Sequence, residues 1–203
     1  MQGMSGTKLQ GWNIVVWSAV AIGIIVAAIW LVDGINEQSM RMAIRATART
    51  SCILFVCAFA ASALQRIWTT GFTTWLLKNR RYLGVSLAVS HTYHAIALIG
   101  LWIVTSHNSP TFDPLGTLGY IFLIAMTVTS FKRPAALIGQ TNWQILHTVG
   151  MHYFWLGFTL EFALRIPKSM PIYLPLVIVL VLAMIVRLFA PLNKQAASLI
   201  VLD

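Results

Sequence analysis

Acidic residues are nearly absent from this sequence: only five of its 203 residues are Asp or Glu, and charged residues of both signs make up just 9%. Apolar residues account for 58%, and the mean hydropathy is +0.78. This composition excludes an ordinary soluble domain and is typical of an integral membrane protein. A separate soluble catalytic domain is excluded as well, because six membrane crossings of about 20 residues each occupy nearly the whole chain.

Cysteine is scarce too, and the motifs of several site classes are missing. Cys52 and Cys57 stand five positions apart in one apolar segment, so they point in different directions on a helix, and we interpret them as buried apolar residues. The sequence contains no helical His-Glu-x-x-His, no Cys-x-x-Cys and no Gly-rich nucleotide-binding fingerprint. A flavin or quinone, if used, is therefore expected to be supplied by a partner.

Six apolar runs, bounded by charges or by Gly and Pro, predict an all-α integral membrane protein. We expect a six-transmembrane-helix bundle that forms one domain, residues 1–203. The run from Val15 to Leu31 is too long for a signal peptide and lacks a cleavage site, so it is expected to be the first span. The semi-polar segment Thr69–Leu77 is expected to lie along the membrane interface. The predicted helices are Trp12–Val32, Thr50–Trp68, Tyr82–Thr105, Leu115–Ser130, Trp143–Leu164 and Ile172–Leu188.

Basic residues divide unevenly between the two sides of this topology. Six crossings place both termini on one side, which takes nine of the fourteen Lys and Arg residues, while the other side takes five. The positive-inside rule therefore predicts cytoplasmic termini, and membrane lipid is expected around the protein. No nucleic-acid partner is expected, because the basic residues are scattered through the connectors. The richer side carries Lys8, Arg66, Lys78, Arg80, Arg81, Lys132, Arg133, Arg187 and Lys194, and the other carries Arg41, Arg45, Arg49, Arg165 and Lys168.

Four of the five histidines lie in two of the predicted spans: His91 and His94 in one, His147 and His152 in the other. An ionisable side chain inside a membrane is costly and therefore marks a candidate functional site. A single histidine in a helical bundle can merely hydrogen-bond a neighbouring helix, but four on two helices favour a cofactor. Imidazoles that face each other across a bundle suit heme iron. His107, in a polar connector, is expected to be solvated.

Helix geometry leaves the choice of heme ligands open. His91 and His94 are three residues apart and share a face, whereas His147 and His152 are five apart and about 140° away from each other. One histidine from each helix would fill both axial positions of a b-type heme, and such an iron would transfer electrons rather than activate oxygen. Depths estimated from helix rise pair His94 with His152, or His91 with His147.

Three arginines, Arg41, Arg45 and Arg49, recur every four residues, which would align them on one face of a helix. The simplest interpretation is a solvated face, or contacts with lipid phosphate. The alternative is that Arg49, at the outer end of the second predicted helix, neutralises a heme propionate through its planar guanidinium.

Several short segments resemble the ferric-reductase-like transmembrane family, especially its bacterial branch that includes the heme-binding membrane subunit of the periplasmic methionine-sulfoxide reductase system. The resemblance spans roughly Thr47 to Trp155. It implies a six-helix b-type cytochrome of a bacterial inner (plasma) membrane, in which His94 and His147 stand at the positions of heme ligands. The segments that carry it are Thr47-Ala48-Arg49-Thr50, Arg80-Arg81-Tyr82-Leu83-Gly84 followed by His94, Thr129-Ser130, and Trp143-Gln144-Ile145-Leu146-His147.

The chain departs from the family pattern at three places. Leu160 stands where family members commonly carry a second histidine on the fifth helix, so one heme is expected rather than two stacked hemes. Ala48 replaces a family glycine. Gln140-Thr141-Asn142 replaces the basic residues that usually precede the fifth helix, which alters the surface that would meet the usual electron donor.

Together these features predict a heme-binding electron-transfer subunit with no catalytic side chains and no nucleotide-binding domain. Electrons would come from a cytoplasmic flavoprotein or from quinol and pass to an acceptor on the outer side. A separate redox partner, either a flavin reductase or a periplasmic oxidoreductase, is therefore expected. The alternative is a heme-free membrane scaffold or anchor subunit of a larger complex. A small transporter ranks third, because Glu161 is the only acidic residue within a predicted span.

Overall fold

The computed structural model describes residues 9–106 and 114–190, and most of these residues are helical. Three residues about which the sequence made predictions, Lys8, His107 and Lys194, lie outside the described residues. The helices are α1 (Trp12–Asp33), α2 (Glu37–Ile67), α3 (Gly71–Val104), α4 (Pro114–Val128), α5 (Lys132–Ala163) and α6 (Met170–Phe189), with a short 3₁₀ turn, η1 (Ile166–Lys168), between α5 and α6.

Each predicted apolar segment coincides with one helix, but α2 and α3 begin well before their apolar parts. α2 begins at Glu37 because the Asn36 side chain accepts a hydrogen bond from the Ser39 N–H at 3.0 Å and caps the helix. α3 begins at Gly71, after a similar cap at Thr70. Most of the segment Thr69–Leu77, which is predicted to lie along the membrane interface, forms the first turns of α3.

Fewer than six helices qualify as membrane spans in the described part of the chain. Four helices, α1, α2, α3 and α6, are long and apolar enough to cross a membrane. α4 and α5 meet this criterion only as a pair, and their directions differ by 111° across the break between them. The 15 residues of α4 extend only about 22 Å, less than a hydrocarbon core of about 30 Å. The structure thus supports a membrane protein with four or five spans, and the predicted six are not confirmed.

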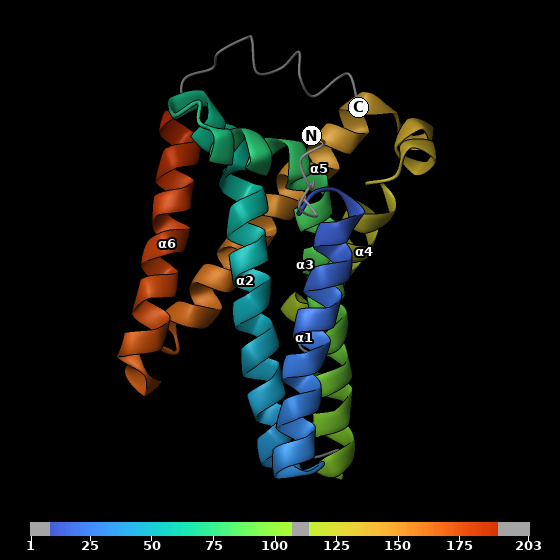
Figure 1. Cartoon of the computed structure of the whole chain (residues 1–203), viewed down its shortest axis with the longest axis vertical. Coiled ribbons are helices and arrows are strands. Elements are labelled where there is room, and N and C mark those ends of the chain that lie inside the picture. The colour runs from blue at the N-terminus through green and yellow to red at the C-terminus, as the bar shows by residue number, and fades with distance from the viewer. Residues whose placement is uncertain (1–8, 107–113, 191–203) are drawn as a thin grey trace, which may run out of the picture.

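The helices form an upright bundle in which α1, α2 and α3 stand side by side, α6 packs on α2, and α5 runs obliquely (Figure 1). α1 begins and α6 ends at the same end of this bundle. We call it the basic end, because it carries seven basic residues and none of the acidic residues that the structure describes. Those acidic residues, Asp33, Glu37 and Glu161, lie toward the opposite end. The basic end carries Arg66, Lys78, Arg80, Arg81, Lys132, Arg133 and Arg187.

Small residues and hydroxyl groups hold α2 against α3. The Ser90 hydroxyl of α3 is fully buried and lies 2.7 Å from that of Ser51 and 3.1 Å from that of Thr50, both on α2. Small side chains let two helix backbones approach closely within a membrane, where interhelical hydrogen bonds add to the packing. The buried small residues of this seam include Ala43 of α2 and Ala97 of α3, which belong to one buried cluster.

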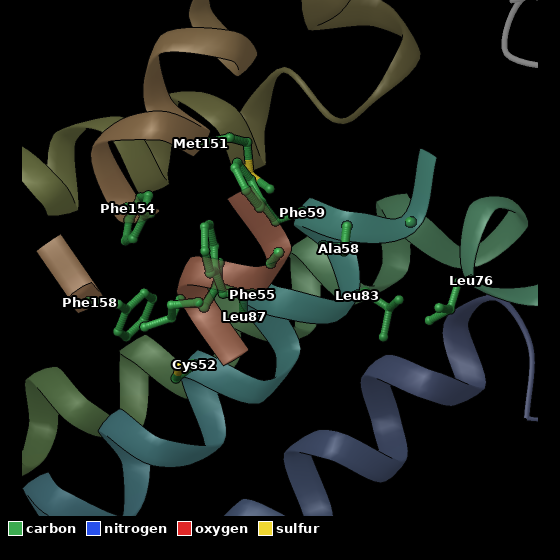
Figure 2. Packing of buried hydrophobic residues seen from close by; sticks show 14 of the residues in the cluster. Cys52, Phe55, Ala58, Phe59, Leu76, Leu83, Leu87, Met151, Phe154 and Phe158 are labelled. Atoms are coloured by element: carbon green, nitrogen blue, oxygen red, sulfur yellow. The ribbon is translucent and has the colours of Figure 1, made fainter. Parts of the chain in front are cut away.

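Large aromatic side chains instead join α2 to α5. Phe55 stacks on Phe59 with ring centroids 5.1 Å apart, and it contacts Phe158 of α5 at 5.4 Å. Figure 2 shows these rings in one cluster with Phe154 and the buried thiol-bearing Cys52. Cys52 is buried as predicted, whereas Cys57 is only half-buried.

Gly139 divides α5 into two parts. Its φ of 76° lies in the left-handed region, which glycine enters without steric cost, and the helix changes direction there. The longer part begins close to Trp143, the predicted start of the fifth helix, while the residues from Lys132 to Ile138 form an additional short helical stretch.

Candidate functional site

His94 of α3 is held by a hydroxyl of α2. Its Nδ1 lies 2.9 Å from Thr47 Oγ1, and this same hydroxyl lies 2.7 Å from the Ala43 carbonyl, to which it can only donate. Because a hydroxyl carries a single proton, Thr47 accepts a hydrogen bond from the Nδ1–H of His94. The resulting tautomer leaves Nε2 unprotonated, which is the form that binds a metal.

His91, one turn earlier on α3, is enclosed by rings. Its centroid lies 5.7 Å from that of His94, 5.7 Å from Phe154 and 5.9 Å from Phe158. The Tyr120 hydroxyl donates to the His91 carbonyl at 3.3 Å. The buried Nδ1 of His91 makes no well-aligned hydrogen bond, and the ring interacts only with the Leu87 backbone one turn earlier. The ring is therefore positioned mainly by packing.

His147 of α5 is engaged by α4. Its Nε2 lies 3.0 Å from Thr129 Oγ1, which in turn lies 2.7 Å from the Ala125 carbonyl. By the same reasoning Thr129 accepts from Nε2–H, so the nitrogen farther from the backbone carries the proton. The ring also stacks on Trp143 at 4.4 Å, and Trp143 Nε1 donates to the Thr129 carbonyl at 2.9 Å. These contacts fasten α4 to α5.

His152, also on α5, has the tautomer of His94 rather than that of His147. Its Nδ1 lies 2.7 Å from the Thr148 carbonyl, which can only accept, so Nδ1 carries the proton and Nε2 is free. The edge of its ring meets Phe59 of α2 at 5.8 Å. Of the two α5 histidines, His152 is thus the one whose Nε2 is available to a metal.

The structure brings His94 together with neither His147 nor His152. His152 meets the ring of Phe59, which lies about 18 Å along α2 from Thr47. Arg80 of α3 interacts electrostatically with His147 and donates to the Ala58 carbonyl of α2 at 3.1 Å. Helix rise places Ala58 about 16 Å from Thr47, the partner of His94. His147 therefore lies near the basic end, while His94 lies near the middle of the bundle. In the described part of the chain, ring contacts join His91 to His94 but join neither to His147 or His152.

Arg49 lies on α2 at the level of the start of α6. Its guanidinium is 5.5 Å from the ring centre of Tyr173, and one of its NH2 groups is 3.5 Å from the Tyr173 hydroxyl. Its buried Nε has no hydrogen-bond partner. Tyr173 also interacts with Arg165, which forms an ion pair with Glu161. Arg41 and Arg45 share the helix with Arg49, as predicted, but they are exposed.

No ready-made metal cage exists among the described residues, since no three His, Cys, Asp or Glu side chains converge. Two pockets, of about 490 and 250 Å³, lie away from the histidines. The larger is lined by residues near the start of α1 and of α3, including Trp75 and Lys78, and the smaller by Arg41 and its neighbours on α2.

The residues of the bundle fit a heme in part. The free Nε2 atoms of His94 and His152 and the unpartnered Nε of Arg49 suit iron and a propionate. The rings of His91, Phe154 and Phe158 fill the space between α3 and α5, so α5 has to shift before a porphyrin enters. His147 fits less well, because its Nε2 is already hydrogen-bonded. Leu160, where the family carries a histidine, is 51% exposed and faces away from the core.

The residues that position the imidazoles were not predicted from the sequence. Thr47 and Thr129 both lie in segments that carry the family resemblance, but nothing in the sequence indicates that each binds a histidine. Tyr173 carried no signal, since a tyrosine near the start of a span is ordinary. Comparisons of the chain with protein-family models, with curated proteins and with solved structures found no match.

Proposed function

We propose that this protein is the heme-binding membrane subunit of a redox system and that it carries electrons across the membrane. The observation that supports this function best is the state of His94, an imidazole within an apolar bundle that is oriented by Thr47 through Nδ1 and has its Nε2 free. Hydrogen bonding of the second ring nitrogen is the usual arrangement for histidines that bind metals. A b-type heme, when bound, supplies the one-electron chemistry.

The chain's own residues have separate tasks in this proposal. His94 is the first axial ligand. His152 is favoured over His147 as the ligand from α5 because its Nε2 is unprotonated, but α5 has to move along the bundle to bring it opposite His94. Thr47 keeps the His94 ring in the ligating tautomer. Arg49 offers its planar fork to a propionate, and the surrounding phenylalanines provide a low-dielectric shell that tunes the iron potential.

The charge distribution supports a cytoplasmic location of the basic end. Of the described residues, seven Lys and Arg side chains lie there against five at the opposite end, where three acidic residues also lie. By the positive-inside rule, we expect the start of α1 and the end of α6 to lie on the cytoplasmic side of a bacterial inner membrane. Electrons would enter there from a flavin reductase or from membrane quinol and leave to a periplasmic oxidoreductase.

A visible spectrum tests the proposal. Full-length protein purified in detergent and supplied with heme should show the absorption of a b-type cytochrome after reduction by dithionite, at a stoichiometry close to one heme per chain. His94→Ala should abolish this absorption, and His152→Ala should convert the low-spin spectrum of a six-coordinate iron into a high-spin one. His147→Ala is the matched control and should keep the low-spin form. Absence of heme absorption in the unaltered protein would refute the function.

A heme-free scaffold or anchor subunit is the second candidate, and the α3–α5 contact favours it. His91 packs directly against Phe154 and Phe158, and His147 is satisfied by Thr129, so the imidazoles already join helices without a cofactor. In that case purified protein would contain no heme, and all four histidine variants would change its thermal stability while leaving its absorption featureless above the protein bands.

A further inference from the structure

Three arginines from three different helices converge at the basic end. Arg80 of α3 donates through Nε to the Ala58 carbonyl, and Arg187 of α6 donates through Nη1 to the Phe59 carbonyl, both at 3.1 Å. These two carbonyls belong to consecutive residues of α2, and the two guanidinium groups interact electrostatically with each other. Arg66 of α2 interacts electrostatically with both of them. We call Arg66, Arg80 and Arg187 the arginine cluster.

The positive charge of the arginine cluster is not neutralised within the described chain. Glu37 and Glu161 are paired with Arg41 and Arg165, and Asp33 lies at the opposite end, where α1 meets α2. The two carbonyls and the Phe59 ring, 4.6 Å from the Arg187 guanidinium, are uncharged partners. They satisfy only part of the five N–H groups that each arginine carries.

One hydrogen-bond donor of the arginine cluster is buried and unsatisfied. Arg66 Nε is inaccessible to solvent and has no hydrogen-bond partner, although Arg66 is the second-last residue of α2. An unsatisfied buried donor on a charged group costs more than on a neutral one, and three like charges in a partly dehydrated site add repulsion. Both penalties disappear if an anion with several acceptor oxygens binds among the three guanidinium groups. Phosphate suits such forks, because guanidinium binds it in a bidentate manner.

The height of the cluster in the membrane indicates where such a phosphate would come from. Arg66 and Arg187 lie within the last turns of α2 and α6. Exposed aromatic residues lie at the same end: Trp12 is 48% exposed, Trp68 59% and Phe189 79%. Exposed aromatic rings of this kind gather at the level of lipid headgroups, where basic pockets between helices bind anionic lipids.

We propose that Arg66, Arg80 and Arg187 form a phosphate-binding site at the basic end and that its occupant is the headgroup of an anionic phospholipid. The lipid joins α2, α3 and α6 through one shared anion, so it stabilises the bundle where these helices meet. This site goes beyond the proposed electron-transfer function and does not depend on it, because neither its residues nor its ligand involve a heme.

Thermal unfolding of delipidated full-length protein in a neutral detergent tests the site. Phosphatidylglycerol should raise the unfolding temperature, and phosphatidylcholine should not. Arg66→Gln, Arg80→Gln and Arg187→Gln should each weaken the apparent affinity for phosphatidylglycerol by roughly fivefold. The matched control is Arg41→Gln with Arg45→Gln, which removes two exposed charges from the opposite end and should leave the affinity unchanged.

A substitute variant and a titration with inorganic phosphate complete the test of the site. If Arg80→Gln fails to fold, Arg187→Lys replaces it, since it keeps the charge but loses the fork and should still weaken binding. In the second measurement, inorganic phosphate replaces the lipid in the thermal unfolding assay. Stabilisation by inorganic phosphate that depends on the three arginines, without an effect of the lipid, would overturn the lipid as occupant. Equal lipid affinity in the cluster variants and in the control would overturn the site itself.

Discussion

Thr47→Val isolates the role of the hydroxyl that orients His94. Valine keeps the shape of threonine at a site where Thr47 is only 1% exposed, so the change removes the 2.9 Å hydrogen bond to Nδ1 without opening a cavity. The Nδ1–H of His94 then loses its hydroxyl acceptor, and only the Ile44 backbone remains as a hydrogen-bond partner of the ring. Loss of a buried hydrogen bond that leaves its donor poorly satisfied costs about 1–3 kcal/mol. Heme bound through Nε2 depends on this tautomer. We therefore expect the heme affinity to fall by roughly 5- to 150-fold.

Titration of the heme-free protein with hemin, followed by absorption, measures this change. Thr50→Val is the matched control, because Thr50 lies one turn away on α2 and its hydroxyl contacts Ser90 and backbone carbonyls but no histidine. It should bind heme as the unaltered protein does. Thr129→Val removes the corresponding hydroxyl from His147. If Thr129→Val weakens binding while Thr47→Val does not, His147 is the ligand and the assignment of His94 is refuted.

Two further changes test the packing of the bundle. Ser90→Ala removes the hydroxyl that binds Ser51, so the free energy of unfolding in an SDS titration should fall by about 1 kcal/mol, and an unchanged value would contradict the polar seam. Gly23→Ala would place a Cβ 2.8 Å from the Tyr93 hydroxyl and should lower the unfolding temperature. Gly84→Ala is the control: its Cβ meets nothing within 4 Å, so this change should maintain or raise the unfolding temperature. Equal effects of the two changes would argue against the close approach of α1 to α3.

The fold was predictable to the extent that it follows from apolar runs. All six runs lie in helices, because a span long enough to cross a membrane satisfies its backbone internally only as a helix or in a barrel. The start of α2 was missed because the residues after Glu37 are polar and do not resemble a span. A local signal was nevertheless present, since Asn36 followed by Ser39 is a helix-capping pattern. The number of spans could not be predicted, because it depends on the bend between α4 and α5.

For the site, the sequence predicts which histidines are candidate ligands but not which residues they contact. The histidines were evident from their position in apolar segments, but their partners depend on how far one helix slides along the next. Thr47 meets His94 because small residues set the register of α2 against α3. His147 lies away from His94 because α5 crosses the bundle obliquely and begins at the basic end. A shift of α3 along α2 by one turn, about 5 Å, would place His91 instead of His94 beside Thr47.

The seam between α2 and α3 also bears on the order in which the protein assembles. These two helices are consecutive in the chain and are separated by only three residues, positions 68–70. They can therefore pair as a hairpin during synthesis, before α5 and α6 have emerged from the ribosome. Thr47 and His94 both belong to this hairpin, so the His94 tautomer is set by contacts that form early. A heme that binds through His94 could thus join a half-built bundle, and the aromatic helix α5 would close over it afterwards.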